Sequence, residues 1–262
     1  MSVFAIIAIS TYFLSVLLIM PGLAGKQKIY ARLTLVLAVI ALVSHGIALK
    51  TLIFVSEGQN LTLLNLGSTV SLLISIIMTI VAFNGRAWFL LPIVYSLSII
   101  NLLLATIMPG EFITHLEASV TTFIHIGLAL LGYATLIIAA LYALQLALLD
   151  YQLKNKKLIF TPDIPPLMVI ERKMFHIIQV GVILLTLTLG TGMIFMDNVF
   201  NKENIHKAIL SICAWVIYLI LLWGHFHHGW RGRRVIVFNL IGAFILTLAF
   251  FGNRLLLHIV TI

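Results

Sequence analysis

The sequence predicts an all-α, polytopic integral membrane protein, and three observations lead to this fold class. Hydrophobic residues occupy 62% of the 262 positions and charged residues only 9%, whereas a soluble domain is nearer half apolar and a quarter charged. The apolar runs are continuous over about 20 residues, the length that a helix needs to cross a bilayer. They also lack the alternating pattern of transmembrane β-strands. Because backbone polar groups must be paired inside lipid, these runs are expected to form helices.

Eight apolar segments are long enough to span the membrane, and they predict a single transmembrane domain over residues 1–262. Their ranges are 2–22, 33–55, 63–83, 87–107, 121–149, 174–196, 207–228 and 235–254. The fifth segment is longer than one crossing needs, so it is expected to tilt or to project from the bilayer. The first has no basic stretch before it and is too long for the apolar part of a signal peptide, so it is interpreted as a retained helix.

Basic residues in alternate loops predict the orientation. One set of loops holds 12 of them, namely Lys26, Lys28, Arg32, Arg86, Lys154, Lys156, Lys157, Arg172, Lys173, Arg231, Arg233 and Arg234. The other side holds only Lys50, Lys202, Lys207 and Arg254. By the positive-inside rule the first set is cytoplasmic, and both termini face outward into the periplasm. The formal net charge of +8 follows from this asymmetry and is not read as a sign of nucleic-acid binding.

The acidic residues argue against an ion-coupled transporter, which usually keeps a carboxylate near the middle of the membrane. All eight lie in loops or at the ends of spans, at Glu57, Glu111, Glu117, Asp150, Asp163, Glu171, Asp197 and Glu203. No nucleophile–base pair, carboxylate dyad or phosphate-binding loop is recognisable, so the chain is not expected to be an enzyme. Its one cysteine, Cys213, excludes a disulfide framework and a CxxCH haem-attachment site.

Histidines are the remaining candidates for chemistry. His45 is near the middle of the second span, and His225 is at the cytoplasmic end of the seventh. His125 opens the fifth span on the outer side, and His258 follows the eighth. A neutral imidazole is a good iron ligand, but an interhelical hydrogen bond to a serine or threonine is the alternative role for His45. The cluster formed by His225, His227 and His228 is either a joint metal site or a polar group at the membrane interface.

Several blocks of sequence, in order along the chain, carry a resemblance to a known family. They are His45 to Leu49 with Leu63 to Ser68, His125 to Leu128 with Gly132 to Ala134, Phe175 to Gly192, and Ala214 to Tyr218 followed by His225 and Gly229 to Arg234. Together they resemble the haem-handling membrane proteins of cytochrome c assembly, the superfamily that includes CcsA, CcmC and CcmF. The resemblance is closer to the short bacterial members, which implies a multi-pass protein of the bacterial inner membrane.

The resemblance implies that haem b is bound non-covalently between paired histidines. The larger family members hold haem at two places, and the matching positions here are His125 with His258 for the outer pair and His45 with His225 for the inner pair. Basic residues are scarce on the outer side, so Arg254 and Lys207 are the expected partners of the propionates of an outer haem. The implied partners are membrane lipid and a haem acceptor or another membrane protein, with no nucleic acid.

The loop before the seventh span departs from the family. Larger members carry a tryptophan-rich signature of the form WGxxWxWDPKE there, and this chain has no tryptophan between Asp197 and Lys207. Those indoles would give haem a flat apolar platform, so full cytochrome c synthase activity is not expected. The alternative function is therefore a non-catalytic accessory or scaffold subunit of another membrane complex that has lost haem. Haem on His45 would favour the first function, and a merely hydrogen-bonded His45 would favour the second.

Overall fold

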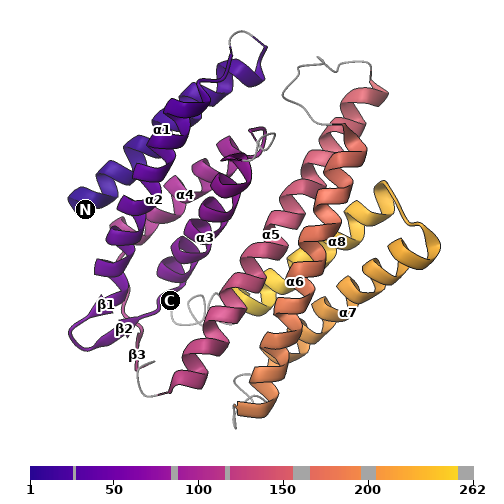
Figure 1. The fold of residues 1–262 in the computed structure, drawn as a ribbon. Coiled ribbons are helices and arrows are strands. Elements are labelled where there is room, and N and C mark those ends of the chain that lie inside the picture. The colour runs from indigo at the N-terminus through magenta and orange to yellow at the C-terminus, as the bar shows by residue number, and fades with distance from the viewer. Residues whose placement is uncertain (26–27, 84–87, 116–118, 156–165, 196–204, 253–262) are drawn as a thin grey trace. The chain divides into compact units, whose positions relative to one another are not determined.

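The computed structural model describes residues 1–25, 28–83, 88–115, 119–155, 166–195 and 205–252 (Figure 1). The helices in these ranges are α1 (Val3–Leu23), α2 (Ala31–Ile53), α3 (Leu63–Phe83), α4 (Leu91–Ile107), α5 (Val120–Lys154), α6 (Leu167–Phe195), α7 (Ile205–His228) and α8 (Arg233–Thr247), which continues as a π-helical turn, η2 (Leu248–Gly252). Seven helical segments have the length and composition to cross a membrane, and α4 is a shorter apolar helix. The predicted all-α, polytopic membrane fold is confirmed, while its orientation stays a prediction.

Two of the helices begin four or more residues away from the predicted starts of their spans. The sequence predicts a fourth span from residue 87, but α4 begins at Leu91 and has Pro92 in its first turn. Proline suits that place because its φ is already helical and its missing N–H would have no helical partner there. The sequence also predicts a sixth span from residue 174, whereas α6 begins at Leu167. Its first turns carry charged residues, which hydropathy assigns to a loop although they continue the helix.

The chain divides into two compact units. Unit 1 comprises Met1–Leu116 with Ile159–Pro165 and holds α1 to α4. Unit 2 comprises Glu117–Leu158 with Pro166–Ile262 and holds α5 to α8. The single domain expected over residues 1–262 stays a prediction.

Unit 1 is packed through small side chains. In this unit α1 contacts α2 and α4, and α3 also contacts α2 and α4. Ala5 and Ala8 of α1, Ala48 of α2 and Leu102 of α4 form a fully buried apolar cluster. Small residues let helix backbones approach closely, which is how helices associate inside lipid.

A small antiparallel sheet closes one end of unit 1, and the sequence did not predict it. Its strands are β1 (Phe54–Val55), β2 (Gly58–Asn60) and β3 (Ile113–Thr114), in the order β1-β2-β3. The side chain of Asn60 donates to the carbonyl of Gly110 at 2.8 Å and accepts from the N–H of Phe112 at 2.9 Å. Strands of two or three residues carry too little alternation to be recognised in a sequence, and here long-range pairing creates them.

Unit 2 is built on the antiparallel pair of α5 and α6, which fit together through glycines. A β-carbon on Gly132 of α5 would lie 3.5 Å from the backbone of Leu185, and one on Gly181 of α6 would lie 2.6 Å from the side chain of Leu136. A third contact of this kind, between Gly192 and His125, lies nearer the start of α5. The three contacts share one antiparallel register, because moving toward the end of α5 by a number of residues moves the contact toward the start of α6 by the same number. The glycines therefore set the separation of the two helices.

Helices α7 and α8 complete unit 2 through one buried polar group. Asn239 of α8 is fully buried and donates to the carbonyl of Ala139 in α5 at 3.0 Å. The hydroxyl of Tyr218 in α7 donates to the backbone and side-chain oxygens of Asn239, both at 3.4 Å. Asn239 thus connects three helices in a setting where an unpaired amide would be costly.

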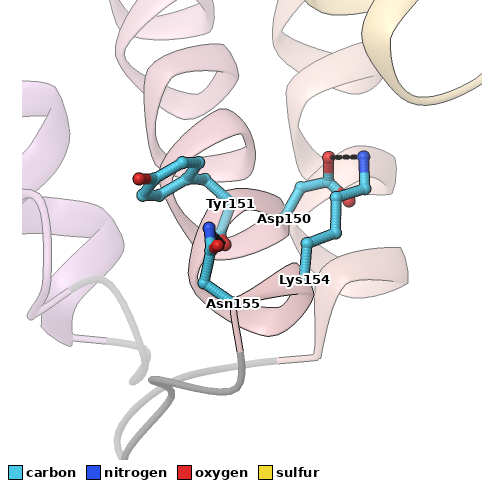
Figure 2. A network of polar contacts seen from close by, with 4 residues as sticks. All are labelled: Asp150, Tyr151, Lys154 and Asn155. Atoms are coloured by element: carbon cyan, nitrogen blue, oxygen red, sulfur yellow. Dashed lines mark hydrogen bonds and ion pairs between the residues drawn. The ribbon is translucent and has the colours of Figure 1, made fainter.

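The last turn of α5 is polar, as Figure 2 shows. Lys154 donates to Asp150 at 2.7 Å, and the side chain of the capping residue Asn155 donates to the carbonyl of Tyr151 at 2.8 Å. The side chains of Lys154 and Asp150 are 71% and 45% exposed. The helix has 35 residues and is therefore roughly 52 Å long, against about 30 Å of hydrocarbon. The exposed ion pair at its end supports the predicted projection from the bilayer.

The orientation of the chain is tested by alkaline phosphatase fusions, because this reporter is active only outside the cytoplasm. We expect active fusions after residues 60, 115 and 202 and inactive fusions after residues 28, 156 and 232, following the asymmetry of Lys and Arg. Immunoblots of the fusions control for their amounts. The opposite pattern of activity would reverse every assignment of a loop to the inner or outer side.

Candidate functional site

The candidate site in unit 2 is centred on His125, which lies in the second turn of α5. Ser119 caps this helix by accepting from the N–H of Thr122 at 3.3 Å. The imidazole is half-buried against α6, and its Nδ1 lies 3.0 Å from the hydroxyl of Thr191. The helix start and the contact with Thr191 thus fix the position of the ring.

The hydrogen bonds around Thr191 favour one tautomer of His125. The hydroxyl of Thr191 donates its hydrogen to the carbonyl of Thr188 at 3.0 Å, so towards His125 it acts as an acceptor. In this tautomer Nδ1 of His125 carries the proton, and the lone pair is on Nε2. This is the tautomer in which a histidine ligates a metal, with its other nitrogen oriented by a hydrogen bond.

Gly192 gives the imidazole of His125 its space. A β-carbon on Gly192 would lie 3.1 Å from Cε1 of His125, closer than ordinary van der Waals contact. Gly190, two residues earlier on the same helix, has no atom within 4 Å of the point where its β-carbon would lie. Of these two glycines, only Gly192 is required to be small by what it packs against.

His225 forms a second such arrangement at the other end of unit 2. Its Nδ1 lies 3.0 Å from the carbonyl of Trp230, which only accepts, so this nitrogen is protonated and Nε2 holds the lone pair. The ring stacks on Phe175 of α6 with centroids 3.4 Å apart and planes at 17°. Phe175 and Gly192 are about 17 residues apart along α6, or roughly 26 Å. His125 and His225 therefore belong to different sites.

His45 has a different environment, in unit 1. It is fully buried, with Nε2 2.9 Å from the hydroxyl of Ser68 in α3 and Nδ1 3.3 Å from the hydroxyl of Tyr12 in α1. A neutral imidazole has one donor and one acceptor nitrogen, and both are used here. In this arrangement neither ring nitrogen of His45 is free to bind iron, so haem does not fit at this position unless a hydroxyl withdraws.

Further buried hydroxyls continue from His45 along α3. Ser75 lies 2.7 Å from Ser98 of α4, and Thr79 lies 2.9 Å from the hydroxyl of Tyr95 of α4. The ring of Tyr95 packs against that of Tyr12, with centroids 5.2 Å apart. We call this set the hydroxyl seam: Tyr12, His45, Ser68, Ser75, Thr79, Tyr95 and Ser98. It joins all four helices of unit 1 through polar contacts that lipid cannot replace.

The remaining histidines show which structural features distinguish a candidate metal ligand from an ordinary histidine. Nδ1 of the exposed His176 lies 2.9 Å from the carbonyl of Arg172 in its own helix, so this tautomer alone does not identify a ligand. In the described part of the chain, no group of three His, Cys, Asp or Glu side chains is arranged to hold a metal ion. His227 and His228 pack beside Trp223, whereas His225 turns toward Phe175. Among the described residues, the imidazoles of His225, His227 and His228 thus do not converge on a joint metal site.

The other predicted site residues are placed as follows. Lys207 lies in the first turn of α7. Helix α7 packs antiparallel to α6, and its register is given by two contacts, Trp215 with Thr186 and His225 with Phe175. This register brings Lys207 to within a turn of the level of Gly192. Arg254 and His258 lie outside the described residues. The inner pair is divided between the units, with His45 in unit 1 and His225 in unit 2.

Sequence reasoning missed the residues that set the histidine environments. Thr191 and Gly192 lie within the block that resembles the family, but their contacts with His125 need the α5–α6 register. Ser68 also lies in such a block, and Tyr12 lies in none. A hydroxyl at helical spacing in an apolar run was the available signal for both.

Comparisons with known proteins identify relatives along the whole chain. A family model described as "Cytochrome C assembly protein" matches residues 33–261. The "Inner membrane protein YpjD" of Escherichia coli (strain K12) is 60% identical over 263 residues, which cover 100% of both chains. The "Uncharacterized 28.8 kDa protein in nifR3-like 5'region" of Azospirillum brasilense is 28% identical over 192 residues, or 71% of each chain. No solved structure matches. Together with the apolar helices, these relatives identify a multi-pass inner-membrane protein.

Proposed function

Because the chain belongs to the cytochrome c assembly protein family, we propose that it binds haem b non-covalently, with His125 as an iron ligand. The observation that carries this proposal is the hydrogen bond from Nδ1 of His125 to Thr191, which leaves the lone pair on Nε2. The absence of a side chain at Gly192 leaves room for the imidazole of His125 in this position. Haem would supply an iron centre that accepts a second imidazole, and the protein would hold it for transfer to an acceptor or within a membrane complex.

The second ligand in this proposal is His258, which follows α8 and η2 in the sequence. At the end of η2, Phe250 stacks on Tyr133 of α5 with centroids 4.8 Å apart, and Phe251 contacts the same ring at 5.6 Å. The described part of α8 and η2 thus runs along α5 toward its start, where His125 lies. Arg254 and Lys207 would pair with the propionates, since guanidinium and ammonium groups bind carboxylates through charge-assisted hydrogen bonds.

The inner pair of His45 and His225 is a separate proposal with uneven support. His225 has the lone pair of Nε2 available, which favours it as a ligand. His45 would bind iron only after Ser68 or Tyr12 gave up its hydrogen bond. The outer haem does not depend on this pair.

The second candidate function is that of an accessory or scaffold subunit, and the hydrogen bonding of His45 favours it. A histidine fixed between Tyr12 and Ser68 stabilises a helix bundle without any cofactor. In this role the chain would bind another membrane protein through its lipid-facing helices and would contain no haem.

The two functions are distinguished by the haem content of protein purified in a mild detergent. We expect the wild type to show a Soret band that sharpens on reduction, and His125→Ala and His258→Ala to lose most of the bound haem. His176→Ala is the matched control, because His176 has the same tautomer but is exposed, and it should keep the wild-type spectrum. Full haem in both variants would remove the outer pair. If the wild-type protein contains no haem even after addition of hemin, haem binding is refuted and the scaffold function is favoured.

A further inference from the structure

A cluster of basic side chains gathers at the end of unit 2 where α7 turns into α8. The N–H of Gly232 in the turn donates to the carboxylate of Glu171 in the first turns of α6 at 3.4 Å. This contact brings together the cations that flank these two residues in the sequence. We call them the basic cluster: Arg172, Lys173, Arg231, Arg233 and Arg234.

The turn that carries the three arginines is held firmly. Gly229 and Gly232 have φ of 62° and 64°, which favour glycine at both positions. Between them the indole of Trp230 fills the space above Gly224, where a β-carbon would lie 2.4 Å from the ring. The backbone carbonyl of Trp230 accepts a hydrogen bond from Nδ1 of His225, and the ring of His225 stacks on Phe175. The arginines are therefore presented from a fixed turn and do not belong to a loose loop.

The five cations of the basic cluster outnumber the one carboxylate, that of Glu171, which the described residues place at this turn. Arg231, Arg233 and Arg234 are exposed, and in the part of the chain that the structure describes none of them forms an ion pair with a carboxylate. The nearby acid, Glu171, is bound to the backbone of the turn. Like charges on this turn and on the adjoining first turns of α6 repel one another, so an anion bound there would be stabilised.

The position of the turn identifies the chemical class of that anion. Helices α7 and α8 both have the composition of membrane spans and are joined by only a few residues. The turn must therefore lie at the membrane surface, where the phosphates of phospholipids lie. Arginine binds phosphate through two parallel N–H···O bonds, and basic pockets between transmembrane helices bind lipid headgroups.

We propose that the basic cluster is a binding site for the headgroup of an anionic phospholipid. The arginines would bind phosphate, and the indole of Trp230, half-buried on Phe238 at a centroid distance of 5.2 Å, would lie beside the upper acyl chain. The number of cations suits a headgroup with two phosphates, so cardiolipin should bind more tightly than phosphatidylglycerol. The site lies at the opposite end of α6 from Gly192 and is therefore separate from the outer haem proposed at His125.

The test measures thermal unfolding of the full chain in phosphatidylcholine nanodiscs that contain increasing fractions of cardiolipin or phosphatidylglycerol. Wild type should be stabilised by cardiolipin at a lower fraction than by phosphatidylglycerol, and inorganic phosphate should have no effect. The double variant Arg231→Gln with Arg234→Gln should bind cardiolipin roughly thirtyfold more weakly, from the usual contribution of two basic residues at a membrane surface. Lys28→Gln with Arg32→Gln is the control, since it removes two positive charges from unit 1.

Three results would overturn the proposal. An equal loss in the control variant would mean that net charge attracts the lipid without a site. Equal stabilisation by inorganic phosphate would assign the cluster to a soluble phosphate compound. Unchanged cardiolipin binding in the double variant, with native mass spectrometry counting the same number of retained lipids, would place the lipid elsewhere.

Discussion

Replacing His45 with alanine is expected to lower the free energy of unfolding by about 3 kcal/mol, since the change empties a buried volume and strips two hydroxyls of their partner. Ser68 and Tyr12 would each lose a hydrogen bond between helices. A single hydrogen bond between helices contributes only a modest free energy in lipid, but here one imidazole connects α1, α2 and α3. The measurement is reversible denaturation by sodium dodecyl sulfate in mixed micelles, followed by circular dichroism.

The control for His45→Ala is His176→Ala, which removes an exposed imidazole bound only to its own helix and should leave stability unchanged. Haem content measured on the same samples separates stability from ligation. Loss of haem from His45→Ala with wild-type stability would make His45 a ligand and would refute its structural role. A loss of stability with unchanged haem per folded protein is the expected result.

Replacing Gly192 with valine is expected to displace the imidazole of His125 and to remove most of any haem bound there. Even the β-carbon of an alanine would lie 3.1 Å from Cε1, and the methyl groups of valine reach further into the ring. The bond between His125 and Thr191 would break, and overpacking of this kind costs about 2 kcal/mol. The reduced spectrum and the denaturation midpoint should therefore change together.

Gly190→Val is the matched control for this prediction, because it makes the same substitution two residues earlier on α6. Nothing lies within 4 Å of the β-carbon at Gly190, so steric displacement is not expected. Both variants introduce the same β-branched residue, so any effect on helix propensity cancels between them. Equal losses of haem and stability in the two variants would show that this segment of α6 does not tolerate valine. The effect of Gly192→Val could then not be attributed to displacement of His125.

The membrane fold could be predicted from the sequence because lipid imposes one dominant rule on it. Long apolar runs must become helices, and these runs coincide with α1 to α8. The predicted starts of α4 and α6 were wrong, because a proline and charged residues occur in the first turn of a helix as readily as in a loop. The sheet of β1 to β3 was missed because its strands have little pattern of their own and depend on pairing across unit 1.

The family was also recognisable in the sequence, from ordered blocks that contain His45, His125 and His225. Those blocks placed histidines near the ends or the middle of spans, which follows from counting residues along a helix. They did not distinguish a ligand from a packed side chain. The cluster at His225, His227 and His228 illustrates this, because neighbours on the chain turn to different surroundings.

The sequence by itself thus determined that this is a helical membrane protein, which apolar runs form its described helices, and where His45, His125 and His225 lie along them. Only the tertiary structure decided what each imidazole contacts, because that depends on the rotation and register of helices that are distant in sequence. His45 meets hydroxyls on both nitrogens, whereas His125 meets Thr191 on one and packs against Gly192. The same residue type is therefore hydrogen-bonded through both nitrogens in unit 1, whereas the described contacts of His125 in unit 2 involve Nδ1.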